Sequence, residues 1–423
     1  MNILGAGFYS AIGTAARLAA ALVIVKLVAV LAGPEGVGRV GQILSLMSVL
    51  AVLAGGGISS GIVKYVAEYR HDRERLERLL SAALGYSFGA SALIGCATLL
   101  FSGPITLWLL GDPGYENLIR VLAVAQFGIA FVNYVVSVIN GFMDVRRLAL
   151  IQTAGSLLVI AAALWLSQRL HLFGVLLALV AGQVLWLAIG LPAWWRSPYF
   201  RRNMLRIRFD REMTLKLAKF SSMTLTAALL GPLVNIAVRD QLALRFGWEQ
   251  VGYWQAVSRV SDAYLLFITA AINIYYLPKL ASIHDRGALA QELRKAWRHL
   301  LPVVVVAAAA IWLARDWITR VLFSAGFSVA LPLYAPQLFG DVVKVASFVL
   351  SYIMLAKAMT RLFVISECVF AASYLVLVYA LTARFGLIGA MYAFAGNYLL
   401  YFAFNLLVAR RYLTELRSCP ASP

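Results

Sequence analysis

Long apolar stretches separated by short polar ones dominate the chain. We expect membrane-crossing helices, each about 20 residues long as a bilayer requires, at 9–32, 39–63, 82–110, 118–141, 148–168, 172–194, 216–244, 251–278, 300–323, 334–357, 362–383 and 387–409. With 62% hydrophobic and only 13% charged residues, the composition excludes an ordinary soluble domain. The first stretch has neither a cationic leader nor a small-residue cleavage site, so it is predicted to be a span. The sequence predicts an all-α integral membrane protein with twelve transmembrane helices.

The net charge of +18 is distributed unevenly over the loops. If the N-terminus is cytoplasmic, most Lys and Arg fall in inner loops such as 64–78, 196–211 and 279–298, and few fall in outer loops. This asymmetry is the positive-inside rule, and it predicts that both termini are cytoplasmic. The basic charge is then a topology signal, and no nucleic-acid partner is expected.

Short glycine motifs repeat at an offset of about 214 residues. Residues 33–38 (GPEGVG) match 247–252 (GWEQVG), and 181–183 (AGQ) match 395–397 (AGN). Six spans in each half would give both halves the same orientation, as in parallel repeats. We expect an N-terminal six-helix bundle over 1–200 and a C-terminal one over 201–423. The basic linker at about 195–215 is either a solvated inner loop or a segment lying on anionic headgroups.

Five ionisable residues fall inside the predicted spans, where a charge costs about 2.5–3.5 kcal/mol on insertion scales. They are Lys26, Arg259, Asp262, Asp341 and Lys344. Helical spacing places most of them on polar seams. The seams comprise Gln255, Arg259 and Asp262 in one span, Gln337, Asp341 and Lys344 in a second, and Asn133 and Asn140 in a third.

Two interpretations of these seams remain open. Polar side chains hold membrane helices together by hydrogen bonds, and Arg259–Asp262 and Asp341–Lys344 could neutralise each other as i,i+3 pairs. Alternatively, the seams line a cleft between the bundles, and its excess of cations would suit an anionic or pyrophosphate-bearing cargo. Lys26 has no acidic residue in its own span, so its partner is expected from another helix or the cargo.

Other polar features give little support to enzyme chemistry. The four histidines lack metal-ligand spacing, and the chain contains no phosphate-binding loop. Cys96 and Cys368 are interpreted as apolar packing residues, and the three scattered cysteines form no disulfide framework. Arg239 and Asp240 are expected to form an interfacial pair. We therefore expect no catalysis, no metal and no cofactor.

Several segments resemble Wzx-type polysaccharide flippases of the multidrug/oligosaccharidyl-lipid/polysaccharide exporter superfamily. They are 64–69 (KYVAEY), 254–258 (WQAVS), 261–264 (SDAY), 267–270 (FITA), 340–345 (GDVVKV) and 355–358 (LAKA). Within that group the chain is most similar to lipid III flippases of enterobacterial common antigen synthesis. The likeness covers essentially the whole chain, and the linker and the tail at 418–423 depart from it.

The resemblance implies a V-shaped pair of bundles in the bacterial inner membrane. It also implies movement of an undecaprenyl-diphosphate-linked oligosaccharide, either lipid III or an O-antigen unit, from the cytoplasmic to the periplasmic leaflet. A polysaccharide polymerase and a chain-length regulator are the partner proteins it suggests.

These implications assign a role to each polar residue of the seams. Lys26, Arg259 and Lys344 would bind the diphosphate. Gln255, Asn133, Asn140 and Gln337 would contact sugars. Asp262 and Asp341 are the coupling-ion candidates.

Two rival functions make different demands on the chain. A drug exporter on the same fold would need an acidic cavity. A membrane polysaccharide polymerase would need a large outer loop carrying catalytic groups.

Overall fold

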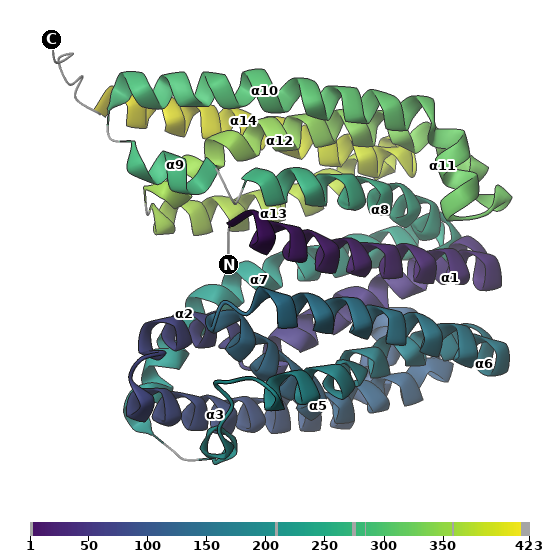
Figure 1. Ribbon diagram of the computed structural model, residues 1–423. Helices are drawn as coiled ribbons and strands as arrows, with labels where there is room; N and C mark the ends of the chain where they lie inside the picture. Colours follow the sequence, from purple (N-terminus) through teal and green to yellow (C-terminus); the bar gives the residue numbers. More distant parts are fainter. Residues whose placement is uncertain (1–2, 208–209, 273–275, 284, 358, 416–423) are drawn as a thin grey trace, which may run out of the picture. The chain divides into compact units, whose positions relative to one another are not determined.

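The computed structural model describes residues 3–207, 210–272, 276–283, 285–357 and 359–415, and these residues form helices and loops without strands (Figure 1). The α-helices of the first half are α1 (Ile3–Ala54), α2 (Ser59–Tyr69), α3 (Arg73–Leu100), α4 (Ser102–Leu110), α5 (Glu116–Gly141), α6 (Val145–Trp195) and α7 (Arg211–Phe246). Those of the second half are α8 (Trp248–Ala271), α9 (Leu277–Ser282), α10 (Arg286–Leu313), α11 (Arg315–Leu322), α12 (Tyr334–Ala356), α13 (Thr360–Phe385) and α14 (Ile388–Glu415). Short 3₁₀ helices are η1 (Pro113–Tyr115), η2 (Arg202–Leu205) and η4 (Ala325–Leu333). The all-α fold class predicted from the sequence is confirmed.

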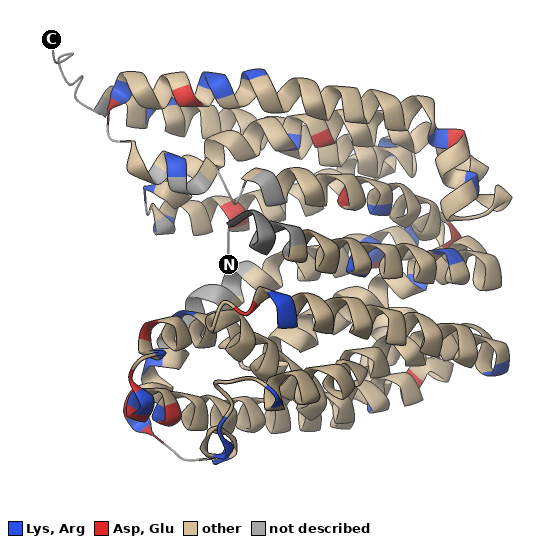
Figure 2. Cartoon of the chain, in the orientation of Figure 1, with Lys and Arg blue, Asp and Glu red and all other residues tan. Residues whose placement is uncertain are grey.

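Eight stretches of the described residues are long and apolar enough to cross a membrane. Val145–Trp195 contains two of the predicted spans, and Ala11–Ala54 covers most of two others, 9–32 and 39–63. Helix α7 contains the predicted span 216–244 and α8 covers most of 251–278, but neither is among the eight. Most of the helix length is free of charge (Figure 2), and large apolar side chains such as Leu100 and Val306 are 79% and 68% exposed. Such apolar surfaces suit contact with lipid, and the chain is a multi-pass membrane protein.

Backbone kinks divide the two long helices where the sequence pattern predicts loops. Gly33 in α1 has φ 60° and ψ −158°, and His171 in α6 has φ 48° and ψ −130°. Gly247 (φ 83°, ψ 165°) and Gly386 (φ 67°, ψ −152°) repeat this conformation 214 and 215 residues later. Positive φ is easily adopted by glycine and is strained for His171. The glycine repeat seen in the sequence therefore has a counterpart in the backbone.

A second pair of repeated glycines allows the turns after these kinks to close tightly. A side chain at Gly174 would overlap the Leu166 carbonyl, and a side chain at Gly389 would overlap the Leu381 carbonyl. Both glycines lie 215 residues apart, as do the two carbonyls. The same local packing therefore occurs once in each half of the chain.

Several predicted span boundaries are wrong because breaks interrupt the helices. The stretch 39–63 is broken at Gly55–Gly57, between α1 and α2, where Gly56 and Gly57 have positive φ. The stretch 82–110 divides at Phe101 into α3 and α4, and 300–323 divides at Ala314 into α10 and α11. Apolar length alone does not resolve such short breaks, although glycine, proline or charged residues accompany each of them: Gly55–Gly57, Gly103-Pro104 and Arg315-Asp316.

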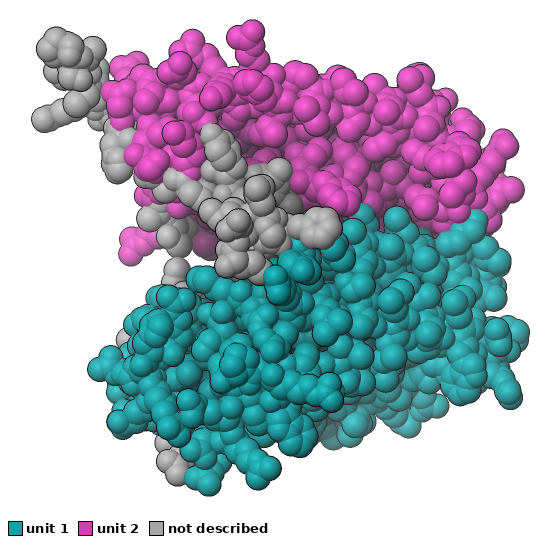
Figure 3. All heavy atoms as spheres, in the orientation of Figure 1, with its two compact units in different colours: residues 1–32, 39–236 teal, residues 33–38, 237–423 magenta. Residues whose placement is uncertain are grey.

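The chain divides into two compact units (Figure 3). Unit 1 comprises residues 1–32 and 39–236, and unit 2 comprises 33–38 and 237–423. The boundary falls within α7, whereas the sequence places the bundle division at residue 200; that functional division remains a prediction. Residues 33–38 pack closely against residues 248–252 of unit 2, and the absence of side chains at Gly38 and Gly252 allows this close packing. A side chain at Gly38 would lie 2.8 Å from the Trp248 carbonyl, and one at Gly252 would overlap the Pro34 carbonyl.

Each unit has its own apolar core. In unit 1, α2, α3, α5 and α6 pack on one another around fully buried residues such as Leu79 and Val138. In unit 2, α12 is the central helix and contacts α8, α9, α10, α13 and α14. Because α12 is covered on most sides, its polar residues lie inside unit 2.

Candidate functional site

Asp341 is the most deeply buried carboxylate of the predicted seams. It lies on α12 with no exposed surface. The Tyr264 hydroxyl, from α8, donates to its Oδ2 at 2.9 Å, and Gln337 Nε2 donates to its Oδ1 at 3.2 Å. Ser261 on α8 also bonds to this carboxylate. A buried charge needs such partners, so the environment of Asp341 is built by two helices.

Lys344 lies one turn beyond Asp341 on α12 and is surrounded by aromatic rings. Its ammonium is 5.8 Å from the centre of the Phe348 ring, 5.7 Å from that of Phe394 and 5.5 Å from that of Tyr398. Aromatic faces stabilise a desolvated cation by about 2 kcal/mol or more in favourable cases. Three rings can therefore hold a lysine inside a membrane span.

Arg239, on α7, is a buried cation that the sequence analysis assigned elsewhere. It is only 4% exposed; its Nε donates to Gln255 Oε1 at 2.7 Å, and its guanidinium lies 5.6 Å from the centre of the Trp254 ring. This burial against α8 contradicts the interfacial position that the sequence suggested for Arg239. Adjacent residues on a helix point about 100° apart. Its position within an apolar stretch is the signal that could have singled it out.

Arg259 and Asp262 follow Gln255 on the same face of α8, within unit 2. Arg259 is half-buried and Asp262 is exposed, and both lie within electrostatic reach of Arg239. Neither Arg259–Asp262 nor Asp341–Lys344 appears among the ion pairs of the described residues. The residues of each i,i+3 pair therefore make no direct ion pair: Asp341 bonds to Tyr264 and Gln337, and Lys344 packs against aromatic rings. Asp341 and Lys344 still lie within electrostatic reach of each other.

A second carboxylate in unit 2 was not singled out from the sequence. Glu367, on α13, accepts a hydrogen bond from the Tyr401 hydroxyl at 2.6 Å. Close by, Asn405 Nδ2 donates to Ser347 Oγ at 3.0 Å. The polar interior of unit 2 therefore has a mixed charge, with Glu367 and Asp341 both bonded to tyrosines.

Unit 1 contains the other predicted site residues, Lys26, Asn133 and Asn140. Lys26 is half-buried on α1. Asn133 Nδ2, on α5, donates to the Ala51 carbonyl of α1 at 2.9 Å, so this amide group ties two helices together. Asn140 is exposed near the end of α5. The remaining six predicted residues, Gln255, Arg259, Asp262, Gln337, Asp341 and Lys344, belong to unit 2.

Two cysteines and the possible metal ligands can be placed within the described part of the chain. Cys96 and Cys368 are exposed on α3 and α13, so their interpretation as packing residues is wrong. The described residues contain no group of three His, Cys, Asp or Glu side chains that could hold a metal ion.

The fold and its apolar helices define a multi-pass helical membrane protein with charged residues buried in unit 2. A solved multidrug resistance transporter of the MATE family, in an inward-facing conformation, matches the fold with a TM-score of 0.80 at 16% identity, over 95% of each chain. At this identity the likeness concerns the fold alone.

Sequence comparison identifies the family. The model of the polysaccharide biosynthesis protein family matches residues 27–332, and the chain belongs to this family. The chain is 33% identical over 404 residues to the lipid III flippases of Escherichia coli (strain K12) and Shigella flexneri, covering 95% of this chain and 97% of each relative.

Proposed function

We propose that this protein is a flippase that moves an undecaprenyl-diphosphate-linked oligosaccharide from the cytoplasmic to the periplasmic leaflet. The observation that carries the proposal is the 33% identity to two lipid III flippases along nearly the full length of both chains. Lipid III or an O-antigen unit is the cargo. The protein resides in the bacterial inner membrane with both termini in the cytoplasm, as the basic inner loops favour.

Transport proceeds by alternating access, in which the two bundles expose the cargo to one side of the membrane and then to the other. Lys26, Arg259 and Lys344 bind the diphosphate by charge-assisted hydrogen bonds, which are strong away from water. The burial of Arg239 beside Gln255 supports a further cationic contact on the same helix pair. The lipid tail stays in the bilayer.

Uncharged seam residues contact the sugars in this proposal. The donor from Arg239 occupies Gln255 Oε1, so the amide NH₂ group of Gln255 is the end that donates to a sugar oxygen. Gln337, Asn133 and Asn140 are the other sugar contacts. The bond from Asn133 to Ala51 means that this side chain offers its carbonyl oxygen.

Asp262 and Asp341 are the proposed sites of coupling to protons or cations, because a buried carboxylate near cations can change its charge state as its environment changes. A polysaccharide polymerase and a chain-length regulator are the proposed protein partners, since they act on the translocated product.

The roles of the three cations can be tested with purified variants in liposomes that contain a lipid-linked oligosaccharide. Lys26→Ala, Arg259→Ala and Lys344→Ala should each insert normally and lose transport. A lost hydrogen bond to a charged group costs about 1.5–3 kcal/mol, which corresponds to a roughly 10–100-fold weaker affinity. Arg169→Ala, at an exposed cation on α6, is the matched control and should transport normally.

Further results distinguish a role in binding the cargo from a structural role and from drug export. Lys344→Met keeps an apolar chain against the rings, so it should fold like the wild type and still fail in transport. Unimpaired transport by all three alanine variants would return these cations to a structural role. Export of a cationic dye without movement of the lipid-linked oligosaccharide would instead favour the drug-exporter function, which the MATE fold permits.

A further inference from the structure

Residues 196–207 of the basic linker between α6 and α7 pack along unit 1. The Tyr199 ring stacks on Phe142 with centroids 4.1 Å apart, and its hydroxyl donates to Asp144 Oδ2 at 3.2 Å. Further along, the Met204 side chain is buried, and its carbonyl accepts from the Tyr134 hydroxyl at 2.9 Å. The linker is therefore anchored to the core of unit 1 at its beginning and in its middle.

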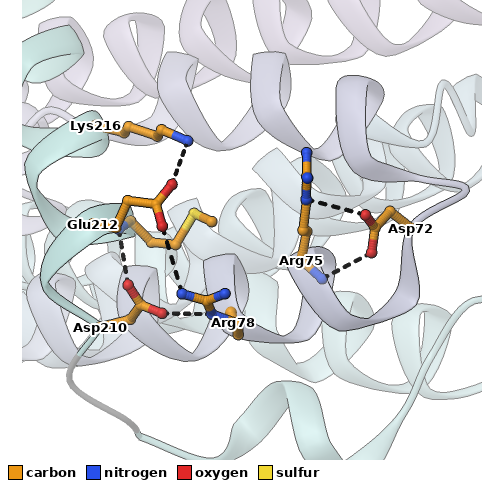
Figure 4. A network of polar contacts seen from close by, with 7 residues as sticks. Asp72, Arg75, Arg78, Asp210, Glu212 and Lys216 are labelled. Carbon is orange, nitrogen blue, oxygen red and sulfur yellow. Dashed lines mark hydrogen bonds and ion pairs between the residues drawn. The ribbon is translucent and has the colours of Figure 1, made fainter.

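Its far end is anchored by ion pairs to α3. Arg78 Nε lies 2.7 Å from Asp210 Oδ2, and Arg78 Nη2 lies 3.6 Å from Glu212 Oε2 (Figure 4). Lys216 pairs with Glu212 at 2.8 Å. The hydrogen bond from Arg78 is the main cause that lowers the pKa of Asp210. These carboxylates are thus already engaged by cations other than the linker arginines.

The linker arginines remain exposed despite these anchors. Residues 196–211 include six arginines and a single acidic residue, Asp210. Arg201, Arg202 and Arg206 are all exposed, and none of them takes part in an ion pair among the described residues. Glu77 lies within electrostatic reach of Arg201, but it is already bonded to Arg73 at 3.2 Å and to Asn203 at 3.3 Å. The surface therefore keeps a large excess of positive charge.

Exposed apolar side chains accompany these arginines. Trp195 is 66% exposed and packs 6.3 Å from Phe200, the residue before Arg201. Leu205 and Ile207 are 41% and 58% exposed on either side of Arg206. Tryptophan favours the level of the lipid headgroups. Because Trp195 ends one membrane helix and the linker leads directly into α7, these side chains lie near the bilayer boundary.

We propose that this surface, formed by Trp195, Arg201, Arg202, Leu205, Arg206 and Ile207, binds the headgroups of anionic phospholipids. Guanidinium groups bind phosphate through paired hydrogen bonds, and basic clusters beside membrane helices attract anionic lipid. The exposed apolar residues favour a membrane over a soluble acidic protein, because they gain from insertion at the interface. The linker then fixes the end of unit 1 to one leaflet, independently of which cargo is transported.

Native mass spectrometry of the detergent-purified protein, given equal amounts of phosphatidylglycerol and phosphatidylethanolamine, tests the proposal. The wild type should retain phosphatidylglycerol preferentially. The triple variant R201Q/R202Q/R206Q should lose at least about tenfold of this preference, since each cation near the surface contributes to lipid attraction. The charge-retaining variant R201K/R202K/R206K should keep most of it, and raising the salt concentration should weaken it in both charged forms.

A second triple variant controls for net charge. R286Q/R298Q/R410Q removes three exposed arginines of unit 2 and should preserve the wild-type preference. Equal losses in both glutamine variants would overturn the proposal, because only overall charge would matter. A wild type without preference, or a linker variant that keeps it, would overturn it too. Unchanged elution in size-exclusion chromatography confirms that each variant is folded.

Discussion

The hydrogen bond between Tyr264 and Asp341 joins α8 to α12 in the interior of unit 2. Replacing Tyr264 by Phe removes only the hydroxyl, so the ring continues to pack while Asp341 Oδ2 loses its donor at 2.9 Å. A hydrogen bond to a charged group contributes about 1.5–3 kcal/mol, whereas polar pairs in membrane proteins average about 0.6 kcal/mol and reach about 1.7 kcal/mol. Because Asp341 has no exposed surface, we expect the upper part of the membrane range, about 1–2 kcal/mol.

A double-mutant cycle measures this energy directly. The wild type, Tyr264→Phe, Asp341→Ala and the double variant would be unfolded reversibly in mixed micelles. The coupling energy is the loss in free energy of unfolding in the double variant minus the sum of the losses in the two single variants. Ser351 serves as the control because its hydroxyl bonds to the Phe348 carbonyl of its own helix at 3.1 Å. Tyr264→Phe and Ser351→Ala should therefore be additive. A Tyr264–Asp341 coupling below about 0.3 kcal/mol, within the scatter of independent sites, would refute the bond as a source of stability.

Two further predictions concern packing and pH. Gly340→Val should lower the free energy of unfolding by about 1–3 kcal/mol, measured in the same micelles, because a side chain there would meet the Phe394 ring at 2.5 Å. Gly396→Ala, where the added carbon meets no atom within 4 Å, should be neutral or stabilising by up to about 1 kcal/mol, and an equal loss in both variants would contradict the packing argument. Because the ion pair with Arg78 lowers the pKa of Asp210, its contribution to stability is present above the ordinary Asp pKa of about 4 and is lost as the pH falls through the lowered native pKa. Asp210→Asn should therefore lower the Tm at pH 7 and match the wild type once Asp210 is protonated; a pH-independent difference would count against this cause.

The helical architecture was predictable because each membrane helix has a local sequence signal, its long apolar stretch. Apolar length alone located the spans, and the glycine repeat anticipated the matching backbone conformations at Gly33 and Gly247. The breaks near Phe101 and Ala314 were not predicted, because apolar length does not resolve a break inside a long span. The local signals were Gly103-Pro104 and Arg315-Asp316, which closely follow the breaks.

The site was only partly predictable, because its contacts join helices that are far apart in the chain. Spacing along α12 placed Gln337, Asp341 and Lys344 on one face, but it suggested an Asp341–Lys344 pair. The structure instead bonds Asp341 to Tyr264, 77 residues away. Likewise, no periodicity within α12 could show that rings from α14 would enclose Lys344.

Leaflet exchange most directly tests the proposal that this protein moves a lipid-linked oligosaccharide across the bilayer. Liposomes would contain a fluorescent undecaprenyl-diphosphate-linked oligosaccharide in both leaflets, and a membrane-impermeant quencher would be added outside. With the wild-type protein, we predict that the quencher reaches nearly the whole fluorescent pool. Quenching limited to the outer leaflet, as in protein-free liposomes, would contradict the account.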